Sequence, residues 1–599
     1  MAEAASLSEN ALVVLQKRYL LKDENGNVIE TPEGMFRRVA KNVASANDRY
    51  SDGRKASKEE EEFFGMMSRL EFLPNSPALM NAATELQQLA ACFVIPVEDS
   101  IEGIYEAIKW AATIQQSGGG VGYSFSRLRP AGDIVKSTMG IASGPVSFMK
   151  VFDSATDVIK QGGRRRGASM GILRVDHPDV ETFIHSKDDL KSLANFNISV
   201  AATDEFMERA KKGEDYELIN PRTKKPAGKK NAAKVFDDIS KSAWRSGDPG
   251  MIFIDTINRT NPTPGVGQIE STNPCGEVPL LPFEACNLGS MNLDKMLTEK
   301  ADGFDVDWER LSKTVDAGIR FLDNVIDVSK YPLPQIDGMA YGNRKIGLGV
   351  MGFADALVKL NMRYGSEESI AFATRLVRFI RERAEQASRS IADARGSFPN
   401  ISKSVFKNPR RNATLLSIAP TGTISMIASC SSGIEPLYAL SYVKHVLDGS
   451  HLREIHPYFI DVAKKKGFWD DRMPDMLAGT HSIREFSSIP PEVREVFVTS
   501  YDVTPEEHVL MQAAFQEQVD NAVSKTINLP AESTKEQVRQ IYALAYERKC
   551  KGITIYREGS RPSQVLTAGD IIQSCPDCGS ALRVQENALV CPTCGYMIG

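Results

Sequence analysis

The residues Asn273, Cys275 and Glu277 place an amide, a thiol and a carboxylate within five positions, in the run Asn-Pro-Cys-Gly-Glu. Cys286 follows nine positions after the glutamate. A thiol between an amide and a carboxylate can be a reactive sulfur beside a hydrogen-bond donor and a general base. A free cysteine is, however, more often buried and inert. The residue types alone leave both interpretations open.

Four of the nine cysteines lie within the last 25 residues, in two Cys-x-x-Cys-Gly motifs separated by twelve residues. Together the motifs offer four thiolates to one tetrahedral ion. The segment is too short to hold a hydrophobic core, so bound metal would supply its folding free energy. We therefore favour a structural zinc ribbon, with a pair of redox-active dithiols as the alternative. The predicted zinc ligands are Cys575, Cys578, Cys591 and Cys594.

Two segments have the composition of phosphate-binding turns. Pro420-Thr-Gly-Thr423 follows an apolar run, and a strand, a turn and a helix start in that order would aim backbone N–H groups and hydroxyls at an anion. Residues 162–167, Gly-Gly-Arg-Arg-Arg-Gly, bring three adjacent guanidinium groups. An ordinary turn explains the first segment equally well, and a solvated loop explains the second.

Gly347, Gly349 and Gly352 have the spacing of the dinucleotide-binding fingerprint. That motif requires an apolar strand before the first glycine, whereas residues 341–346 are mostly polar. Glycines that permit close helix packing explain the pattern better, so we do not expect a nicotinamide site.

The composition is that of an ordinary globular protein, with 42% hydrophobic residues, 25% charged residues and a net charge of −5. This charge argues against a protein that coats nucleic acid, and so few cysteines argue against a disulfide scaffold. No secretory signal is recognisable, and the longest uncharged run, at 412–434, contains Pro420 and glycines that break a membrane helix. We expect a protein of the reducing cytoplasm, with neither nucleic acid nor membrane as a partner.

The elements that must position these residues follow from the hydrophobic periodicity. Residues 7–70 show helical spacing, with Thr31-Pro-Glu33 as a helix start. Beyond them, short apolar runs bounded by Gly, Pro or Asn alternate with helices, which is typical of one large α/β domain. We predict an N-terminal helical region at 1–72, an α/β catalytic domain at 73–558, and a linker and cysteine-rich tail at 559–599.

Taken in order, these motifs resemble the large catalytic subunit of ribonucleotide reductases, and most closely the adenosylcobalamin-dependent class II branch. The resemblance covers nearly the whole chain and implies a ten-stranded α/β barrel with a radical cysteine on a loop inside it. The segments that carry it are 75–81, 91–93, 118–122, 162–168, 273–277, 344–349, 420–423, 432–436, 550–560 and the tail cysteines.

The resemblance also implies the role of each central residue. Cys275 would carry a thiyl radical that removes the ribose 3′-hydrogen in a cavity that excludes water. Glu277 would be the base on the 3′-hydroxyl, and Asn273 would hold the substrate hydroxyls. Cys92 and Cys286 would reduce the 2′-position and end as a disulfide.

Substrate and effector contacts follow from the same resemblance. The effector, a dNTP or ATP, would bind at the interface of a homodimer and act on the substrate base through the arginine loop. No residue is assigned to the cobalamin. The substrate-binding candidates are Ser76, Ala91, Pro420, Thr421, Gly422 and Thr423, and the effector candidates are Asp153, Arg164, Arg165 and Arg166.

Radical initiation distinguishes the branches of the family. Class I subunits carry a tandem tyrosine pair that receives an electron hole from a metal-containing partner subunit, whereas this chain has a single tyrosine, Tyr556, in that stretch. We therefore expect adenosylcobalamin as the cofactor, with cobalt–carbon homolysis supplying a 5′-deoxyadenosyl radical. The alternatives are a class I-type catalytic subunit and, from another class, a zinc-ribbon nucleic-acid-binding protein, which explains only the tail.

Two departures from the family concern regulation and re-reduction. The chain begins directly at the first helix, so we expect no ATP-cone domain and no inhibition by dATP. No cysteine follows Cys594, so re-reduction of the active-site disulfide is expected from a tail Cys-x-x-Cys or an external dithiol such as thioredoxin. We expect diphosphate substrates, and Cys430 and Cys550 have no assigned role.

Overall fold

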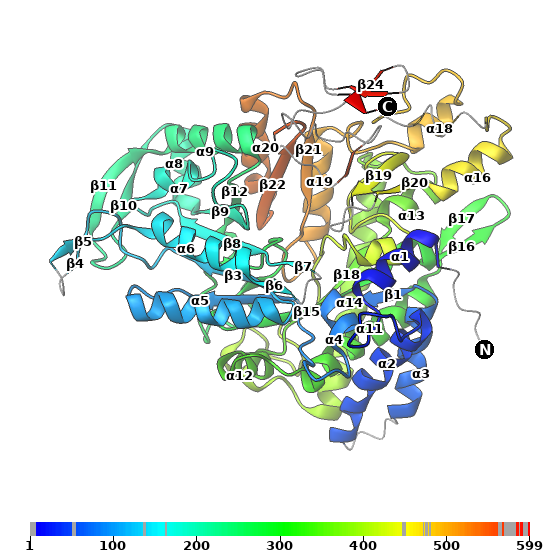
Figure 1. Cartoon of the computed structure of the whole chain (residues 1–599), viewed down its shortest axis with the longest axis horizontal. Coiled ribbons are helices and arrows are strands. Elements are labelled where there is room, and N and C mark those ends of the chain that lie inside the picture. The colour runs from blue at the N-terminus through cyan, green and yellow to red at the C-terminus, as the bar shows by residue number, and fades with distance from the viewer. Residues whose placement is uncertain are drawn as a thin grey trace.

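The structure is a computed structural model that describes residues 7–50, 56–135, 139–161, 165–445, 451–470, 473, 477 and 481–560, with short strands at 566–567, 583–585, 588–590 and 597–598. Figure 1 shows a helix-covered sheet with the N-terminal helices packed at one side. Within these residues, no helix combines the length and the apolar character needed to span a membrane.

The N-terminal region is helical, as expected from its periodicity. Helix α2 begins at Pro32 after Thr31, whose hydroxyl accepts the backbone N–H of Gly34 at 3.0 Å. Its apolar positions recur on one face, which packs on α3. The helices of this region are α1 (Glu9–Arg18), α2 (Pro32–Ala44), α3 (Ala56–Ser68) and α4 (Ser76–Asn81).

A ten-stranded sheet forms the centre of the molecule, in the order β1-β15-β2-β3-β8-β9-β12-β22-β21, with β18 paired to β15. Neighbours from β2 to β12 are parallel, as are β15 with β18 and β21 with β22. The first group pairs antiparallel with the other two, through β2 with β15 and through β12 with β22. The strands are β1 (Phe72–Pro74), β2 (Cys92–Pro96), β3 (Gly120–Ser124), β8 (Ser169–Arg174), β9 (Phe196–Ala202), β12 (Gly250–Phe253), β15 (Ala285–Asn292), β18 (Ile346–Met351), β21 (Thr526–Leu529) and β22 (Gly552–Arg557).

The segment 415–418 closes this sheet into a barrel. Leu416 makes a parallel bridge to Leu348 of β18, and Ile418 makes one to Val523, three residues before β21. The closed ring therefore contains every strand of the sheet except β1, together with this segment. The expected ten-stranded barrel is present, with the segment 415–418 in the place of its tenth strand.

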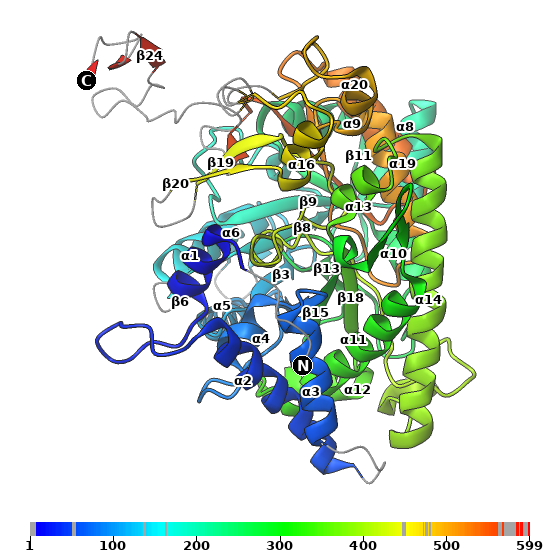
Figure 2. The same ribbon diagram turned by 90° about the vertical axis from the view of Figure 1, so that its right-hand side faces the viewer.

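Helices cover the outside of the barrel, as Figures 1 and 2 show. Helix α5 packs on β2 and β3, α11 on β15 and β18, and α9 and α20 on β22. The helices are α5 (Ile101–Gln116), α6 (Pro145–Val158), α7 (Val180–Ile184), α8 (Asp204–Lys212), α9 (Ala232–Ser246), α10 (Ile254–Arg259), α11 (Trp308–Val328), α12 (Pro334–Asn343), α13 (Phe353–Lys359), α14 (Glu367–Arg395), α15 (Ile424–Ile427), α16 (Pro457–Lys465), α18 (Pro491–Val496), α19 (Pro505–Gln516) and α20 (Lys535–Glu547).

Short strand pairs decorate this body. They are β4 (Ile134–Val135) with β5 (Gly140–Ile141), β6 (Lys160–Gln161) with β7 (Arg165–Arg166), β10 (Asp215–Ile219) with β11 (Pro226–Asn231), β13 (Ser271–Thr272) with β14 (Pro279–Leu280), and β16 (Leu297–Lys300) with β17 (Gly303–Val306). A small sheet joins β19 (Ser441–His445), β20 (His451–Ile455) and β23 (Leu566–Thr567), and another joins β24 (Arg583–Gln585), β25 (Ala588–Val590) and β26 (Met597–Ile598).

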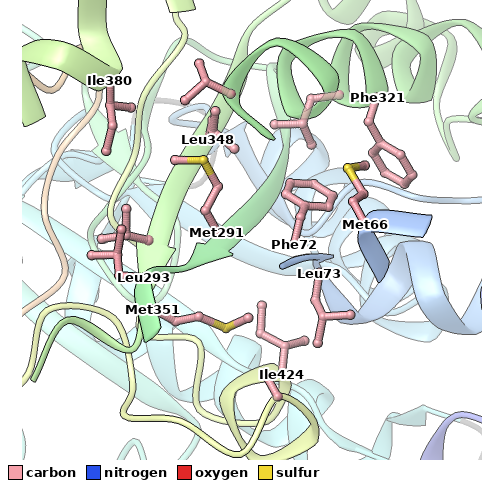
Figure 3. Packing of buried hydrophobic residues seen from close by; sticks show 14 of the residues in the cluster. Met66, Phe72, Leu73, Met291, Leu293, Phe321, Leu348, Met351, Ile380 and Ile424 are labelled. Carbon is pink, nitrogen blue, oxygen red and sulfur yellow. The ribbon is translucent and has the colours of Figure 1, made fainter. Parts of the chain in front are cut away.

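One hydrophobic core joins the N-terminal helices to the barrel. Figure 3 shows Met66 of α3 and Phe72 of β1 in the same cluster as Met291 of β15 and Phe321 of α11. The rings of Phe72 and Phe321 meet edge to face, with centroids 5.3 Å apart, and all four side chains are 3% exposed or less. The two regions share their packing.

A buried ionic network ties the same parts together. Arg344, just before β18, pairs with Asp323 and Asp327 of α11 at 2.9 Å each, and the three side chains are at most 3% exposed. The hydroxyl of Tyr50, from the N-terminal region, donates to Asp327 at 2.8 Å and accepts from Arg411 at 2.6 Å. Each charge has an opposite charge as partner, which burial requires.

The glycines at 347–352 correct one expectation. Gly347 and Gly349 lie within β18 itself, so no separate strand precedes the motif. A Cβ on Gly349 would lie 2.3 Å from the carbonyl oxygen of Ser417, and one on Gly347 would lie 2.5 Å from Leu288. The glycines therefore permit close approach of neighbouring strands in the barrel, and the expected helix packing was wrong.

Candidate active site

The hairpin β13–β14 carries Cys275 at its tip. Asn273 closes the loop, because its side-chain oxygen accepts the N–H of Val278 at 3.0 Å and its carbonyl accepts that of Gly276 at 3.0 Å. Gly276 has a φ of +83°, which an L side chain rarely adopts. The result is a tight loop in which Cys275 is exposed while Glu277 is buried.

Several strands hold this hairpin inside the barrel. A Cβ on Gly122 of β3 would lie only 1.7 Å from the carbonyl oxygen of Thr272, so the two backbones are in contact. From β9, the side-chain amide of Asn197 donates to the carbonyl of Pro274 at 2.9 Å. From the closing segment, the Ser417 hydroxyl donates to the carbonyl of Glu277 at 2.9 Å. The loop therefore projects into the barrel, as the resemblance implies.

Replacing Gly122 with alanine should displace the hairpin, because the new methyl group overlaps the Thr272 carbonyl. We expect a loss of about 1–3 kcal/mol in the free energy of unfolding, typical of overpacking, and a fall in turnover. Denaturant unfolding and product formation measure the two effects. The control is Gly338→Ala in α12, where a Cβ meets nothing within 4 Å. Equal behaviour of the two variants would contradict the contact.

Cys92 and Cys286 lie directly opposite each other. They are register partners on the antiparallel strands β2 and β15, although 194 positions separate them in sequence. Both are thiols and are 3% and 1% exposed. Antiparallel partners have Cβ atoms about 4.5–5.5 Å apart, close to the spacing that a disulfide requires. Burial raises the pKa of both thiols.

Cys92 also contacts the hairpin. The side-chain amide of Asn273 donates to its sulfur at 3.1 Å. After burial, the charges of Glu277, Cys286 and Cys275 raise the pKa of Cys92 further. The fold thus gathers the five residues of the predicted catalytic set around one point in the barrel.

Glu277 has the electrostatics of a general base. It is 2% exposed, and burial raises its pKa to about 7. Its Oε2 atom is buried and has no hydrogen-bond partner among the described residues. A carboxylate with a pKa near the working pH is well matched to proton transfer.

The turn at 420–423 follows the closing segment of the barrel. Thr421 is buried with a φ of +53°, and its hydroxyl accepts the N–H of Gly433 at 2.8 Å. Gly422 is exposed, and a Cβ on it would meet nothing within 4 Å. Pro420 and Thr423 are half-buried on either side, and α15 begins one residue later. The exposed glycine leaves room for a ligand.

Ser76 and Ala91 approach the site from other elements. Ser76 is the first residue of α4, and its hydroxyl lies 2.7 Å from that of Tyr19, just after α1. Helix α1 also contacts α15, so it connects α4 with the turn at 420–423. Ala91 directly precedes Cys92, and its N–H donates to the carbonyl of Cys286 at 3.2 Å.

The described effector candidates lie on α6 and on the strand pair that follows it. Asp153 of α6 accepts the N–H of Asn195 at 2.9 Å, just before β9. Arg165 and Arg166 form β7, which pairs with β6 directly after α6. Arg164 lies outside the described residues.

The tail cysteines Cys575, Cys578, Cys591 and Cys594 also lie outside the described residues, so zinc binding stays a prediction. The short strands β24, β25 and β26 pair antiparallel between and beyond the two motifs. Of the two unassigned cysteines, Cys550 is buried in the core and Cys430 is half-buried.

Sequence reasoning missed Asn197, Glu284 and Lys345 as parts of this site. Asn197 holds the hairpin, and Glu284 and Lys345 form a buried ion pair at 2.6 Å beside Cys286. The available signal for Lys345 was its position directly before an apolar, glycine-containing strand, which suggests that its side chain is buried. A buried lysine almost always has a charged partner, so this position could have predicted the ion pair.

Comparison with known proteins gives consistent matches. A family model described as "Ribonucleotide reductase, barrel domain" matches residues 90–409 and 400–556, and one described as "Ribonucleotide reductase, all-alpha domain" matches residues 5–87. A solved structure, the class Id ribonucleotide reductase alpha subunit of Actinobacillus ureae, aligns with a TM-score of 0.76 at 23% identity over 92% of this chain and 97% of that chain. This likeness concerns the fold.

Curated relatives are more similar in sequence. A protein of Mycobacterium tuberculosis (strain CDC 1551 / Oshkosh) named "Vitamin B12-dependent ribonucleoside-diphosphate reductase" is 50% identical over 565 residues, covering 94% of this chain and 81% of its own length. A protein of the same name from Thermoplasma acidophilum is 47% identical over 621 residues, covering 94% of this chain and 80% of its own length.

Proposed function

Since the chain belongs to the ribonucleotide reductase family, in its vitamin B12-dependent branch, we propose that it reduces ribonucleoside diphosphates to 2′-deoxyribonucleotides through a thiyl radical on Cys275. The observation that carries the proposal is the position of Cys92 opposite Cys286, beside a loop that holds Cys275 and a buried carboxyl. The family matches do not favour the nucleic-acid-binding alternative.

Each residue then has a step in the reaction. The Cys275 thiyl removes the ribose 3′-hydrogen and returns it at the end, and Glu277 takes the proton of the 3′-hydroxyl. The 2′-hydroxyl leaves as water, and Cys92 and Cys286 supply two hydrogens and become a disulfide. Asn273 orients the substrate hydroxyls. The four residues other than Cys275 are buried, which keeps water from the groups that act beside the radical.

The surroundings of Cys275 suit a large cofactor. The thiol is exposed, and a Cβ on the neighbouring Gly276 would meet nothing within 4 Å, so one side of the loop is open. When bound, adenosylcobalamin supplies the radical that oxidises the Cys275 thiol. The residues of this chain that would meet it are Cys275 and the adjoining glycine.

Effector control and dimerisation are part of the proposal. Ile101 and Tyr105 of α5 are 57% and 55% exposed, and Val158 of α6 is 82% exposed. These two helices pack together, and each carries exposed apolar side chains of the kind found where proteins associate. We propose a homodimer across α5 and α6, with the effector dNTP or ATP bound there near Asp153.

Zinc and the reductant complete the proposal. The two Cys-x-x-Cys-Gly motifs have the spacing of a zinc ribbon. A thioredoxin-like dithiol is the proposed electron donor for the Cys92–Cys286 disulfide.

The test is direct. The protein is incubated with adenosylcobalamin, a dithiol and a ribonucleoside diphosphate, and deoxyribonucleotide is quantified by chromatography. We expect product only when cobalamin is present. Activity that needs a metal-containing partner subunit instead would identify a class I-type enzyme.

Cys286→Ser should separate the two kinds of cysteine. We expect multiple turnover to fall about 10³-fold or more because the reducing dithiol is lost, while radical formation stays detectable by electron paramagnetic resonance. Equal loss of the radical signal and of turnover would contradict the division of roles.

A further inference from the structure

Cys286 lies between two chemically different neighbours in the barrel wall. Its register partner on β2 is Cys92. On the other side, β15 pairs parallel with β18 from Asn287 and Ile346 onward, and one step back in this register places Lys345 beside Cys286. Register partners have side chains on the same face, with Cβ atoms about 5 Å apart. The central thiol thus has a thiol on one side and an ammonium group on the other.

Lys345 is held in this place by a buried ion pair with Glu284. Its amine lies 2.6 Å from Oε2 of Glu284, and both side chains are 1% exposed. Glu284 precedes Cys286 by two positions and therefore shares its face of the strand. The carboxylate also accepts the amide of Asn343 at 2.5 Å and the N–H of Leu281 at 2.7 Å. Stability does not explain such a pair, because a buried ion pair rarely stabilises a fold more than well-packed apolar residues of similar volume do.

The pair makes the two thiols electrostatically unequal. Burial raises the pKa of Cys286; the nearby charge of Lys345 opposes this increase, and the charges of Glu284 and Glu277 each reinforce it more weakly. Burial also raises the pKa of Cys92, and there the charge of Glu277 adds to the increase. Negative charge is therefore more favourable on Cys286 than on Cys92.

We propose that Lys345 stabilises Cys286 as the leaving thiolate when the Cys92–Cys286 disulfide is re-reduced, so that an external dithiol attacks Cys92. The inference rests on the proposed function, because it requires this disulfide to form. The reductant thiolate bonds to the Cys92 sulfur, and the electron pair of the broken S–S bond goes to the Cys286 sulfur beside the ammonium. The second thiol of the reductant then displaces Cys92, leaving the reductant oxidised, and water supplies the protons that restore both thiols.

The first test locates the attack in the wild-type protein. Oxidised protein is treated with a monothiol such as 2-mercaptoethanol, quenched in acid and mapped by mass spectrometry. We expect the mixed disulfide on Cys92, with at least about fivefold less on Cys286. A preponderance on Cys286 overturns the proposal, and this measurement needs no variant to fold.

The second test measures reduction of the oxidised protein by dithiothreitol. Lys345→Met keeps the volume but removes the charge, and we expect the rate constant to fall about tenfold or more because the leaving thiolate loses its cation. Lys345→Arg restores the charge and should recover most of the rate. In prereduced Lys345→Met, the single turnover that needs no external dithiol should fall much less than the rate of disulfide reduction does. Equal loss in the single turnover and in reduction would show a merely structural role and overturn the proposal.

The matched control is Lys551→Met. Lys551 is also a buried lysine, but its amine donates to the carbonyls of Asp520 and Asn521. In Lys551→Met, we expect the Cys92–Cys286 disulfide to be reduced at a rate within about twofold of wild type, because this variant leaves the charge beside the leaving thiolate unchanged. A tenfold loss in Lys551→Met would refute a specific role for Lys345. Failure of the proposed function appears differently, as absence of a Cys92–Cys286 disulfide after turnover of the wild-type protein.

Discussion

Cys275→Ser should abolish deoxyribonucleotide formation, with a loss of roughly 10⁴-fold or more, as when a residue that performs the chemistry is removed. The O–H bond of serine is much stronger than the S–H bond of cysteine, so serine cannot be converted to a radical carrier under the same conditions. The thiol sits at the tip of a loop whose backbone is held by Asn273 and Asn197, so an isosteric change leaves the loop in place. Chromatographic detection of product, with cobalamin and dithiol in excess, measures the effect.

The control for this variant is Cys430→Ser, which changes a half-buried cysteine outside the catalytic set. We expect its turnover to stay within about threefold of wild type, as for substitutions away from special features. Cobalamin-dependent product from Cys275→Ser at more than a per cent of the wild-type rate would refute Cys275 as the radical carrier.

Glu277→Gln should lower kcat by about 10²–10⁴-fold, the usual contribution of a general base. In the wild type, burial raises the pKa of Glu277 to about 7, so the base is present above that pH and protonated below it. The rate should therefore rise with pH up to about pH 7 and then level off, whereas the small residual rate of the glutamine variant should not show this rise. The pH profile of kcat distinguishes the two; an unchanged rise in Glu277→Gln would assign it to another group.

The same carboxyl should affect stability in the opposite direction. Its pKa in the folded state, about 7, lies above its ordinary value of 4.5, so the folded protein binds this proton more tightly than the unfolded chain. The resulting loss of stability is absent below about pH 4.5, develops as the pH rises to 7 and is complete above it, at on the order of 3 kcal/mol. Glu277→Gln should lack this component. Denaturant unfolding of both proteins at about pH 5 and pH 8 tests it; parallel pH dependences would contradict a buried, charged carboxylate.

Local signals in the sequence predicted the local structure well. Thr31 and Pro32 mark the start of α2 because capping and a fixed φ act within one turn. The α/β barrel came from the resemblance to a family, and the closed ring of nine strands and the segment 415–418 agrees with it. The pairing of Cys92 with Cys286 was likewise implied by resemblance, since no spacing rule connects positions 194 residues apart.

Features that depend on contacts distant in sequence escaped prediction. Gly349 suggested close helix packing, whereas glycine is required there because the backbone carbonyl of Ser417 lies against it. Lys345 gave no sign of facing Cys286, because strand register decides which side chains meet across a barrel. Both results follow from where two segments are paired, which no window of neighbouring residues contains.

The core shared by the N-terminal helices and the barrel has a consequence for how the chain unfolds. The two family models meet between residues 87 and 90, yet Met66, Phe72 and Phe321 pack in one cluster across that boundary. Tyr50 is bonded into the ionic network of α11 and β18 on the same side. Opening the helical region would expose this cluster and leave buried charges without partners, so we infer that both regions belong to a single cooperative unit. Amide hydrogens of α2 and of β18 should accordingly exchange with solvent through the same global opening.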